Sequence, residues 1–213
     1  MASWQREPAR RSGTWSAFRQ VGEGYPPLWH PGSQYQPTPQ PAGRWHQAGR
    51  SYAQYLSLEP DGAWAELVRY EAIRSEPERR EYRHRLWVLT VDETDIADLE
   101  SFDSIEACGL DPTMVVDDDH GPCQTLSVEL RESGYRGVLS PSAAIADIVN
   151  LTLFGSRREL IDRSDWDRNP RPDFFVPVSV AAEPAPPPPH VLGLARLYGD
   201  PHIGYERWIA AQG

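Results

Sequence analysis

Short hydrophobic runs that are rich in β-branched and aromatic side chains predict several β-strands. Such runs, bounded by polar or turn-forming residues, are typical of strands. The four runs are "SYAQYLSL" (residues 51–58), "YRHRLWVLTVD" (82–92), "GVLS" (137–140) and "NLTLF" (150–154). Helical patterns stand between them, so we expect the chain to combine strands with helices.

Hydrophobic residues at helical spacing predict a helix that begins near Pro60. Trp64 and Leu67 share one face of this helix, and Ser57 is expected to be its N-cap. Glu66 falls on the opposite side, where it faces either water or a second buried surface. The pattern also allows the helix to end near Leu67 and continue as a strand.

The remaining segments carry less regular patterns. Residues 123–137 predict a helix that ends at Gly134, residues 92–110 an acidic helical region, residues 75–81 a charged turn, and residues 140–150 a turn with a short helix. Residues 117–120, three aspartates and a histidine, are of the types that bind metal ions. A run of like charges before a Gly-Pro pair is more typical of a solvated loop, which is the interpretation we favour.

The length of the chain suits one domain with a well-buried core, and its composition divides it into three parts. Residues 1–14 are polar and predict a flexible leader, and residues 15–160 predict the domain. Residues 161–213 predict a C-terminal extension with a proline-rich spacer at 183–190. Within the domain, residues 15–49 are rich in proline, which excludes a long helix, and in aromatic residues, which favour an ordered loop.

Charge and composition exclude several classes of function. A net charge of −10 and a pI near 5.0 argue against a nucleic-acid-binding surface, because such surfaces are usually basic. All 21 basic residues are arginine, which excludes a lysine nucleophile and leaves guanidinium groups to bind a small anion. Cys108 and Cys123 are too few for a disulfide scaffold. Without a secretory signal or an apolar run of about 18 residues, we expect a cytoplasmic protein that does not span a membrane.

Four short motifs carry residues that are suited to catalysis or binding. They are "GRWHQAG" with Arg44 and Trp45, "YLS" with Tyr55, "WAELV" with Glu66, and "GVLSPSA" with Ser142. Each of these residues taken singly also has an ordinary role in core packing, solvation or helix capping. Their order along the chain is therefore the informative feature.

The order and spacing of the motifs resemble the RES domain family, with "FR" at Phe18 and Arg19 as its leading arginine and "NLTLF" as the following strand. The resemblance covers residues 17–160 and implies a toxin of a bacterial toxin–antitoxin system that consumes NAD. It also implies an α+β, ADP-ribosyltransferase-like fold, in which two β-sheets with surrounding helices form a central cleft. His46 replaces the asparagine that is usual in the loop motif, which puts that amide's hydrogen bonds in doubt.

By this resemblance, three residues act on the charged parts of NAD. Glu66 is expected to hold the ribose hydroxyls and to stabilise the cation that forms as nicotinamide leaves. Arg44, supported by Arg19, is expected to bind the diphosphate, because guanidinium groups fit phosphate oxygens bidentately.

Three further residues are expected to shape the pocket. Tyr55 is placed to stack on the cationic nicotinamide ring. Ser142 is expected to bind the amide or a phosphate from the start of a short helix. Trp45 is expected to wall the cleft.

NAD is expected as the substrate, and neither a resident cofactor nor a metal ion is expected. The acceptor depends on access to the cleft, so hydrolysis and phosphorolysis with inorganic phosphate both stay open. So do two alternatives: a protein ADP-ribosyltransferase that uses NAD, and a non-catalytic module that binds a protein partner. The family implies an Xre-type antitoxin that covers the cleft. The sequence leaves homo-oligomerisation and the roles of residues 92–120 and 161–213 undecided.

Overall fold

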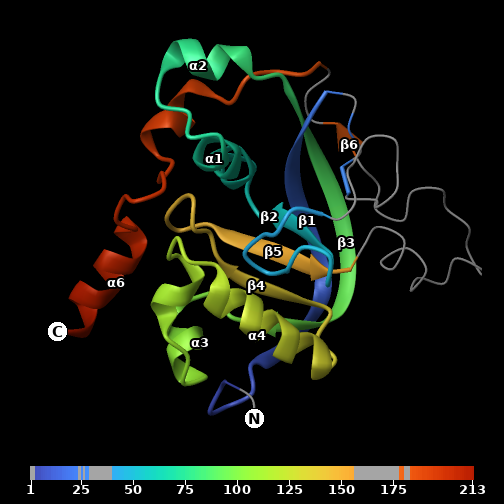
Figure 1. Ribbon diagram of the computed structural model, residues 1–213, viewed down its shortest axis with the longest axis vertical. Helices are drawn as coiled ribbons and strands as arrows, with labels where there is room; N and C mark the ends of the chain where they lie inside the picture. The colour runs from blue at the N-terminus through green and yellow to red at the C-terminus, as the bar shows by residue number, and fades with distance from the viewer. Residues whose placement is uncertain (1–2, 24, 26, 29–39, 156–177, 180–182) are drawn as a thin grey trace, which may run out of the picture.

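The computed structural model describes residues 3–23, 25, 27–28, 40–155, 178–179 and 183–213, which combine strands and helices (Figure 1). The strands are β1 (Ala9–Gly22), β2 (Ala53–Ser57), β3 (His84–Asp98), β4 (Gly137–Pro141), β5 (Val149–Phe154) and β6 (Val178–Ser179). The helices are α1 (Pro60–Tyr70), α2 (Glu76–Glu81), α3 (Phe102–Ala107), α4 (Gly121–Glu132) and α6 (Ile203–Gln212), with 3₁₀ helices η1 (Pro112–Val115) and η2 (Pro189–Gly193). The expected α+β class is confirmed.

One hydrogen-bonded sheet contains all of these strands. Its order is β1-β2-β5-β4-β3-β6, and β1 also pairs with β3, so that β1, β2, β5, β4 and β3 close into a ring. The antiparallel β1–β3 ladder runs from the Ala9–Asp98 pair to the Gly22–His84 pair, and these two long strands curve side by side (Figure 1). The expected two separate sheets are not confirmed, because these long strands link the short ones into a single network.

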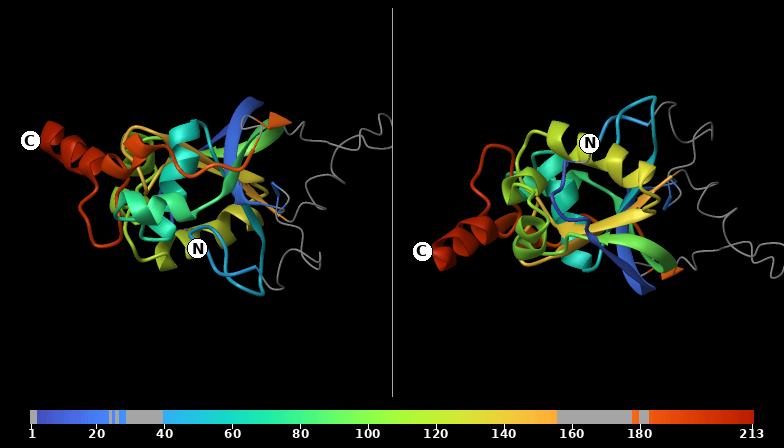
Figure 2. Two further views of the ribbon diagram at one scale, coloured as in Figure 1. Left: turned by 90° about the horizontal axis from the view of Figure 1, so that it is seen from above. Right: turned by 90° about the horizontal axis from the view of Figure 1, so that it is seen from below.

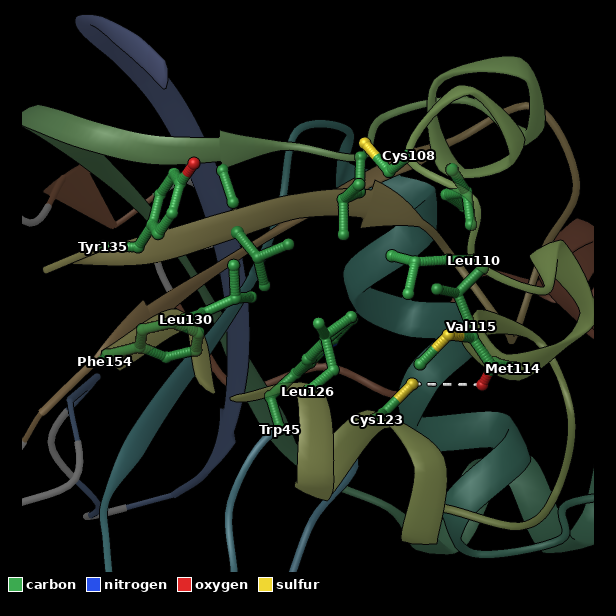
Figure 3. Packing of buried hydrophobic residues seen from close by; sticks show 14 of the residues in the cluster. Trp45, Cys108, Leu110, Met114, Val115, Cys123, Leu126, Leu130, Tyr135 and Phe154 are labelled. Carbon is green, nitrogen blue, oxygen red and sulfur yellow. Dashed lines mark hydrogen bonds between the residues drawn. The ribbon is translucent and has the colours of Figure 1, made fainter. Parts of the chain in front are cut away.

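A hydrophobic cluster fills the space between α4 and the short strands (Figure 3). Leu126 and Leu130 point from α4 into this cluster and are almost completely buried, as is Val138 of β4. Trp45 enters the same cluster from the loop that precedes β2, and its side chain is only 2% exposed. Burial of so large an aromatic side chain fixes this loop to the core.

The start of α1 differs from the expectation in its cap. The helix begins at Pro60 as predicted, but its N-cap is Glu59, and no side chain caps it. Ser57 instead ends β2, and its hydroxyl accepts a hydrogen bond from the Glu59 backbone N–H at 3.3 Å. The helix continues to Tyr70, so the alternative of a strand near Leu67 is wrong.

Several other boundaries are corrected by the structure. Residues 75–81 contain helix α2, which Ser75 and Glu78 cap reciprocally, rather than a charged turn. The acidic region is helical only in α3, because its first seven residues continue β3. Residues 142–148 form turns without a helix. Residues 9–14 of the predicted flexible leader belong to β1 and pair with β3.

The C-terminal segment folds back on the domain before it projects outward. Val191 and Leu197 are buried in a cluster with Trp64 and Leu67 of α1. Helix α6 buries none of its residues and extends away from the body of the molecule (Figure 2). Residues 29–39 of the predicted aromatic loop and 161–177 of the predicted extension lie outside the described residues. Over the ranges given above, no helix has the length and hydropathy needed to cross a bilayer.

Both cysteines are buried, and we expect both thiols to be unreactive in the folded protein. The Cys123 thiol donates a hydrogen bond to the Met114 carbonyl at 3.0 Å (Figure 3), and burial raises its pKa to about 11. Burial also raises the pKa of Cys108. Because the thiolate is the reactive form, a thiol reagent at pH 8 should modify the native protein roughly a hundredfold more slowly than the protein in guanidinium chloride. Equal rates in the two conditions would contradict this burial.

Candidate active site

A pocket of about 710 Å³ lies between α1, the loop before β2 and the strands β1, β2, β4 and β5. This volume falls within the range of small-molecule and cofactor sites, which is about 300–1,000 Å³. The pocket brings together five of the six residues that the sequence singled out, namely Arg19, Arg44, Trp45, Tyr55 and Glu66. The sixth, Ser142, is fully buried directly behind Glu66.

The Glu66 carboxylate is held in place by two side chains from the β4–β5 region. The Ser142 hydroxyl donates to Glu66 Oε1 at 3.0 Å, and the Asn150 amide donates to the same oxygen at 2.7 Å. Within the described part of the chain nothing bonds to Oε2, so this oxygen is available to a ligand. The sequence allowed Glu66 to face either water or a second buried surface. In the structure it faces the lined pocket.

Asn150 was not singled out from the sequence, although it stands in the predicted strand "NLTLF". In β5 it lies opposite Ser57 of β2 and Ser140 of β4, which places it at the floor of the pocket. Its Oδ1 atom is buried without a hydrogen-bond partner among the described residues. A buried acceptor without a partner is costly, so this oxygen is suited to accept a hydrogen bond from a ligand.

Ser142 supports the carboxylate rather than the pocket wall. Besides donating to Glu66, its hydroxyl accepts a hydrogen bond from the Ala144 backbone N–H at 3.2 Å. Its exposed fraction is 0%. Direct contact between this hydroxyl and NAD stays a prediction, and the helix that was expected to begin here is absent from residues 142–148.

Tyr55 and the "GRWHQAG" loop form a second hydrogen-bonded group. The Tyr55 hydroxyl accepts from the Trp45 backbone N–H at 2.9 Å and bonds to His46 Nδ1 at 2.8 Å. A Cβ atom on Gly43 would stand 2.5 Å from this hydroxyl, so only glycine fits there. The Trp45 ring packs mainly into the core, whereas its loop contributes to the pocket wall.

Arg19 is a half-buried cation without a carboxylate partner among the described residues. Its Nη1 donates to the Gln54 side chain at 3.0 Å. Burial lowers the pKa of Arg19 to about 10, against the opposing effect of the nearby Tyr55 phenol. Because charges that are partly removed from water are usually paired, a guanidinium in this position favours an anionic ligand.

Arg44 is held by backbone carbonyls. It donates to the carbonyls of Met114 at 3.2 Å and of Asp117 at 2.7 Å, which fixes the loop after η1 against the pocket. Carbonyls do not neutralise its charge, so Arg44 adds positive potential on this side of the pocket.

No three His, Cys, Asp or Glu side chains in the described segments are grouped to hold a metal ion.

Four buried or half-buried histidines make the stability of the fold sensitive to mild acid. Burial lowers the pKa of His46, His84, His120 and His202 below the ordinary value of 6.5. The unfolded chain therefore binds more protons than the folded chain as the pH falls through this value. The stability that the neutral rings contribute is present above pH 6.5 and is lost below it.

We expect the free energy of unfolding in urea to fall between pH 7.5 and pH 5.5. A His202→Gln variant, which removes one of these buried rings, should show a shallower fall than the unchanged chain. Carboxyl groups whose pKa is lowered, such as Asp118, lose their contribution to stability only at lower pH, because the pKa of Asp118 lies below 3.8. A free energy that is constant or rises over this range would exclude the proposed effect.

Comparison with known proteins agrees with this geometry. The RES domain family matches residues 14–172, which is most of the chain and includes every residue of the pocket discussed so far. The chain belongs to the RES domain family. The resemblance inferred from the motifs is therefore confirmed, and the motif loop, the tyrosine strand, the glutamate helix and the serine turn of this RES domain converge as the family order suggested.

Two individual proteins are similar to this RES domain. The Mycobacterium tuberculosis protein named Probable NAD(+) phosphorylase Rv3189 is 29% identical over 132 residues, which cover 59% of this chain and 63% of that protein. The crystal structure of the M. tuberculosis MbcT–MbcA toxin–antitoxin complex contains a chain with the same fold at a TM-score of 0.59. The two share 21% sequence identity, and the match covers 81% of this chain and 87% of the other.

Proposed function

We propose that this RES domain cleaves the bond between nicotinamide and ribose in NAD. The observation that carries the proposal is one pocket in which a fixed carboxylate, Glu66, lies with a half-buried guanidinium, Arg19, that has no carboxylate partner among the described residues. NAD offers a matching pair of features, since its ribose becomes cationic during cleavage and its diphosphate is anionic. The relative that is named an NAD(+) phosphorylase supports the same assignment.

Glu66 would act on the ribose as the bond breaks. The C1′–N1 bond releases its electron pair to nicotinamide, which leaves as a neutral molecule, and positive charge develops on the ribose. A carboxylate that is already oriented by Ser142 and Asn150 stabilises this charge without reorganising. Its free Oε2 atom can accept from a ribose hydroxyl, and Asn150 Oδ1 can accept from a second donor of the substrate.

Arg19 and Arg44 would bind the diphosphate, and Tyr55 would contribute an aromatic surface for the nicotinamide ring. Partial burial strengthens the attraction between Arg19 and an anion, because water screens the charge less. Burial also raises the pKa of Tyr55, so its phenol stays neutral and its hydroxyl keeps the loop closed through Trp45. This assignment needs no resident cofactor, because NAD is consumed.

Inorganic phosphate is the acceptor that we propose. An oxygen of phosphate would form the new bond to C1′ and give ADP-ribose 1″-phosphate, whereas water would give ADP-ribose. The name of the M. tuberculosis relative favours phosphate. Two alternative functions stay open. The protein could transfer ADP-ribose to another protein, or it could be a partner-binding module without activity.

We further propose an antitoxin as the protein partner and an ADP-ribosyltransferase-like arrangement for the fold. The partner is supported by the toxin–antitoxin complex that contains a chain of the same fold, and its Xre type rests on the family resemblance. The arrangement is supported by a cleft bounded by strands on one side and by α1 on the other. Co-expression with the product of a neighbouring gene, followed by purification through a tag on one chain, tests the partner.

A single assay separates the proposed reactions. The purified, folded protein is mixed with NAD in the presence and absence of phosphate, and the products are separated and weighed by mass spectrometry. We expect free nicotinamide in both cases if water can react, and ADP-ribose 1″-phosphate only with phosphate. Protein whose mass has increased by that of an ADP-ribosyl group would favour transfer. Intact NAD in both conditions would refute the proposal.

A further inference from the structure

Residues 195–200 of the C-terminal segment reach the pocket, although they lie beyond the range that matches the family. The Arg196 backbone N–H donates to the Ala144 carbonyl at 2.7 Å, next to the serine turn. Leu197 is 8% exposed and packs into the cluster beneath α1. Tyr198, the next residue, is part of the pocket lining.

An arginine–aspartate network fixes this segment in place. Asp118 pairs with Arg69 of α1 and, at 3.1 Å, with Arg196. It also accepts a hydrogen bond from the Gly199 backbone N–H at 2.6 Å. The Arg69 guanidinium donates a hydrogen bond to the Arg196 carbonyl at 3.3 Å. Because Arg69 is almost completely buried, these contacts give the segment a defined position rather than a loose one.

The Tyr198 ring is held over Arg69 yet keeps an open surface. Its ring centroid lies 4.1 Å from the Arg69 guanidinium carbon, which is a cation–π contact. The residue is nevertheless 44% exposed. Arg69 follows Glu66 by three positions, so the two lie next to each other on one face of α1. An exposed aromatic ring therefore lies against the helix that carries the carboxylate, in the lining of the same pocket.

We propose that Tyr198 is a substrate-contacting residue that stacks on the adenine base of the dinucleotide, an inference that rests on the proposed function. Arg69 lies against the Tyr198 ring, and its charge is shared through Asp118 with that of Arg196. A second cation, such as the ring of oxidised nicotinamide, is disfavoured on a tyrosine ring that already contacts a guanidinium. Adenine is neutral and presents a large flat surface, which suits stacking on tyrosine.

The test measures binding on a background that does not turn the ligand over. Titration calorimetry is run on Glu66→Gln and on the same variant with Tyr198→Ala, Tyr198→Phe or Leu194→Ala. The ligands are NAD, ADP-ribose, which keeps adenine, and nicotinamide mononucleotide, which lacks it. Leu194 is the matched control, because it is exposed in the same segment and does not line the pocket.

We expect Tyr198→Ala to weaken NAD and ADP-ribose by about tenfold, equivalent to about 1.4 kcal/mol. Binding of the mononucleotide should not change. Tyr198→Phe keeps the ring and should bind NAD and ADP-ribose as tightly as the Glu66→Gln parent. Leu194→Ala should also bind like this parent. Unchanged affinity in Tyr198→Ala, a loss restricted to nicotinamide-bearing ligands, or failure of phenylalanine to restore binding would each overturn the inference.

The same measurements distinguish this inference from the proposed function. If the unchanged chain does not cleave NAD but Tyr198→Ala still weakens dinucleotide binding, the proposed reaction fails and the stacking role stands. If NAD is cleaved and the affinity does not depend on Tyr198, the reaction stands and the stacking role fails. If the unchanged chain neither cleaves NAD nor binds ADP-ribose, both are refuted.

Discussion

Replacing Glu66 by glutamine is expected to slow NAD cleavage by roughly 10²–10³-fold. Glutamine keeps the shape of the side chain and can still accept from Ser142 or Asn150, so the fold and the pocket should persist. What is lost is the negative charge that stabilises the ribose cation. The measurement is the initial rate of nicotinamide release at saturating NAD, with folding checked by circular dichroism.

Glu59→Gln is the matched control for this substitution. Glu59 is exposed, immediately precedes α1, and does not line the pocket. The same chemical change there should leave the rate within a factor of two of the unchanged chain. A Glu66→Gln protein that keeps more than a tenth of the activity would show that the carboxylate charge is not what lowers the barrier.

Replacing Trp45 by alanine is expected to lower the free energy of unfolding by about 3–5 kcal/mol. Its ring is the largest fully buried side chain of the described chain, and it packs with Leu126 and Leu130 of α4 (Figure 3). Removal leaves a cavity that the closed ring of strands cannot collapse to fill. Guanidinium chloride unfolding, followed by circular dichroism, gives the change.

Leu194→Ala provides the comparison for this loss. Leu194 is 54% exposed, and substitutions at such positions usually change stability by less than about 0.5 kcal/mol. If Trp45→Ala cost no more than about 1 kcal/mol, the ring would not anchor the loop. Activity should fall with stability, since the Trp45 backbone N–H holds the Tyr55 hydroxyl in the pocket.

The sequence predicted the elements whose signal is local. β2, β4 and β5 follow from dense runs of strand-forming residues, and α1 follows from its apolar stripe and Pro60. Helix α2 was missed although its capping signal, Ser75 followed by Glu78, is written in the sequence. Five charged residues among seven resemble a turn unless the cap is given more weight than the composition.

The extension of β3 through its acidic residues could not be predicted from local pattern. Glu93 points inward where a strand normally places an apolar residue, and it is almost fully buried. It is tolerated because Arg136, more than forty positions later, donates to it at 2.8 Å. A pairing between distant residues leaves no trace in the periodicity of either segment.

The candidate site was predictable as far as the family motifs extend. Their order identified Glu66 and Arg19, and the structure places both in one pocket. Asn150 was missed because a single asparagine in a strand has no motif of its own, and Tyr198 because it lies outside the family match. Only the fold shows that the C-terminal segment returns to α1.

The ring of strands has an uneven boundary beside the pocket. β1 follows β3 along nearly its whole length, but it meets β2 at a single pair, Phe18 with Ser57. The Arg19–Gln54 bond crosses the same boundary. Few backbone bonds need to open for this seam to widen, whereas the long β1–β3 ladder holds the rest of the ring together.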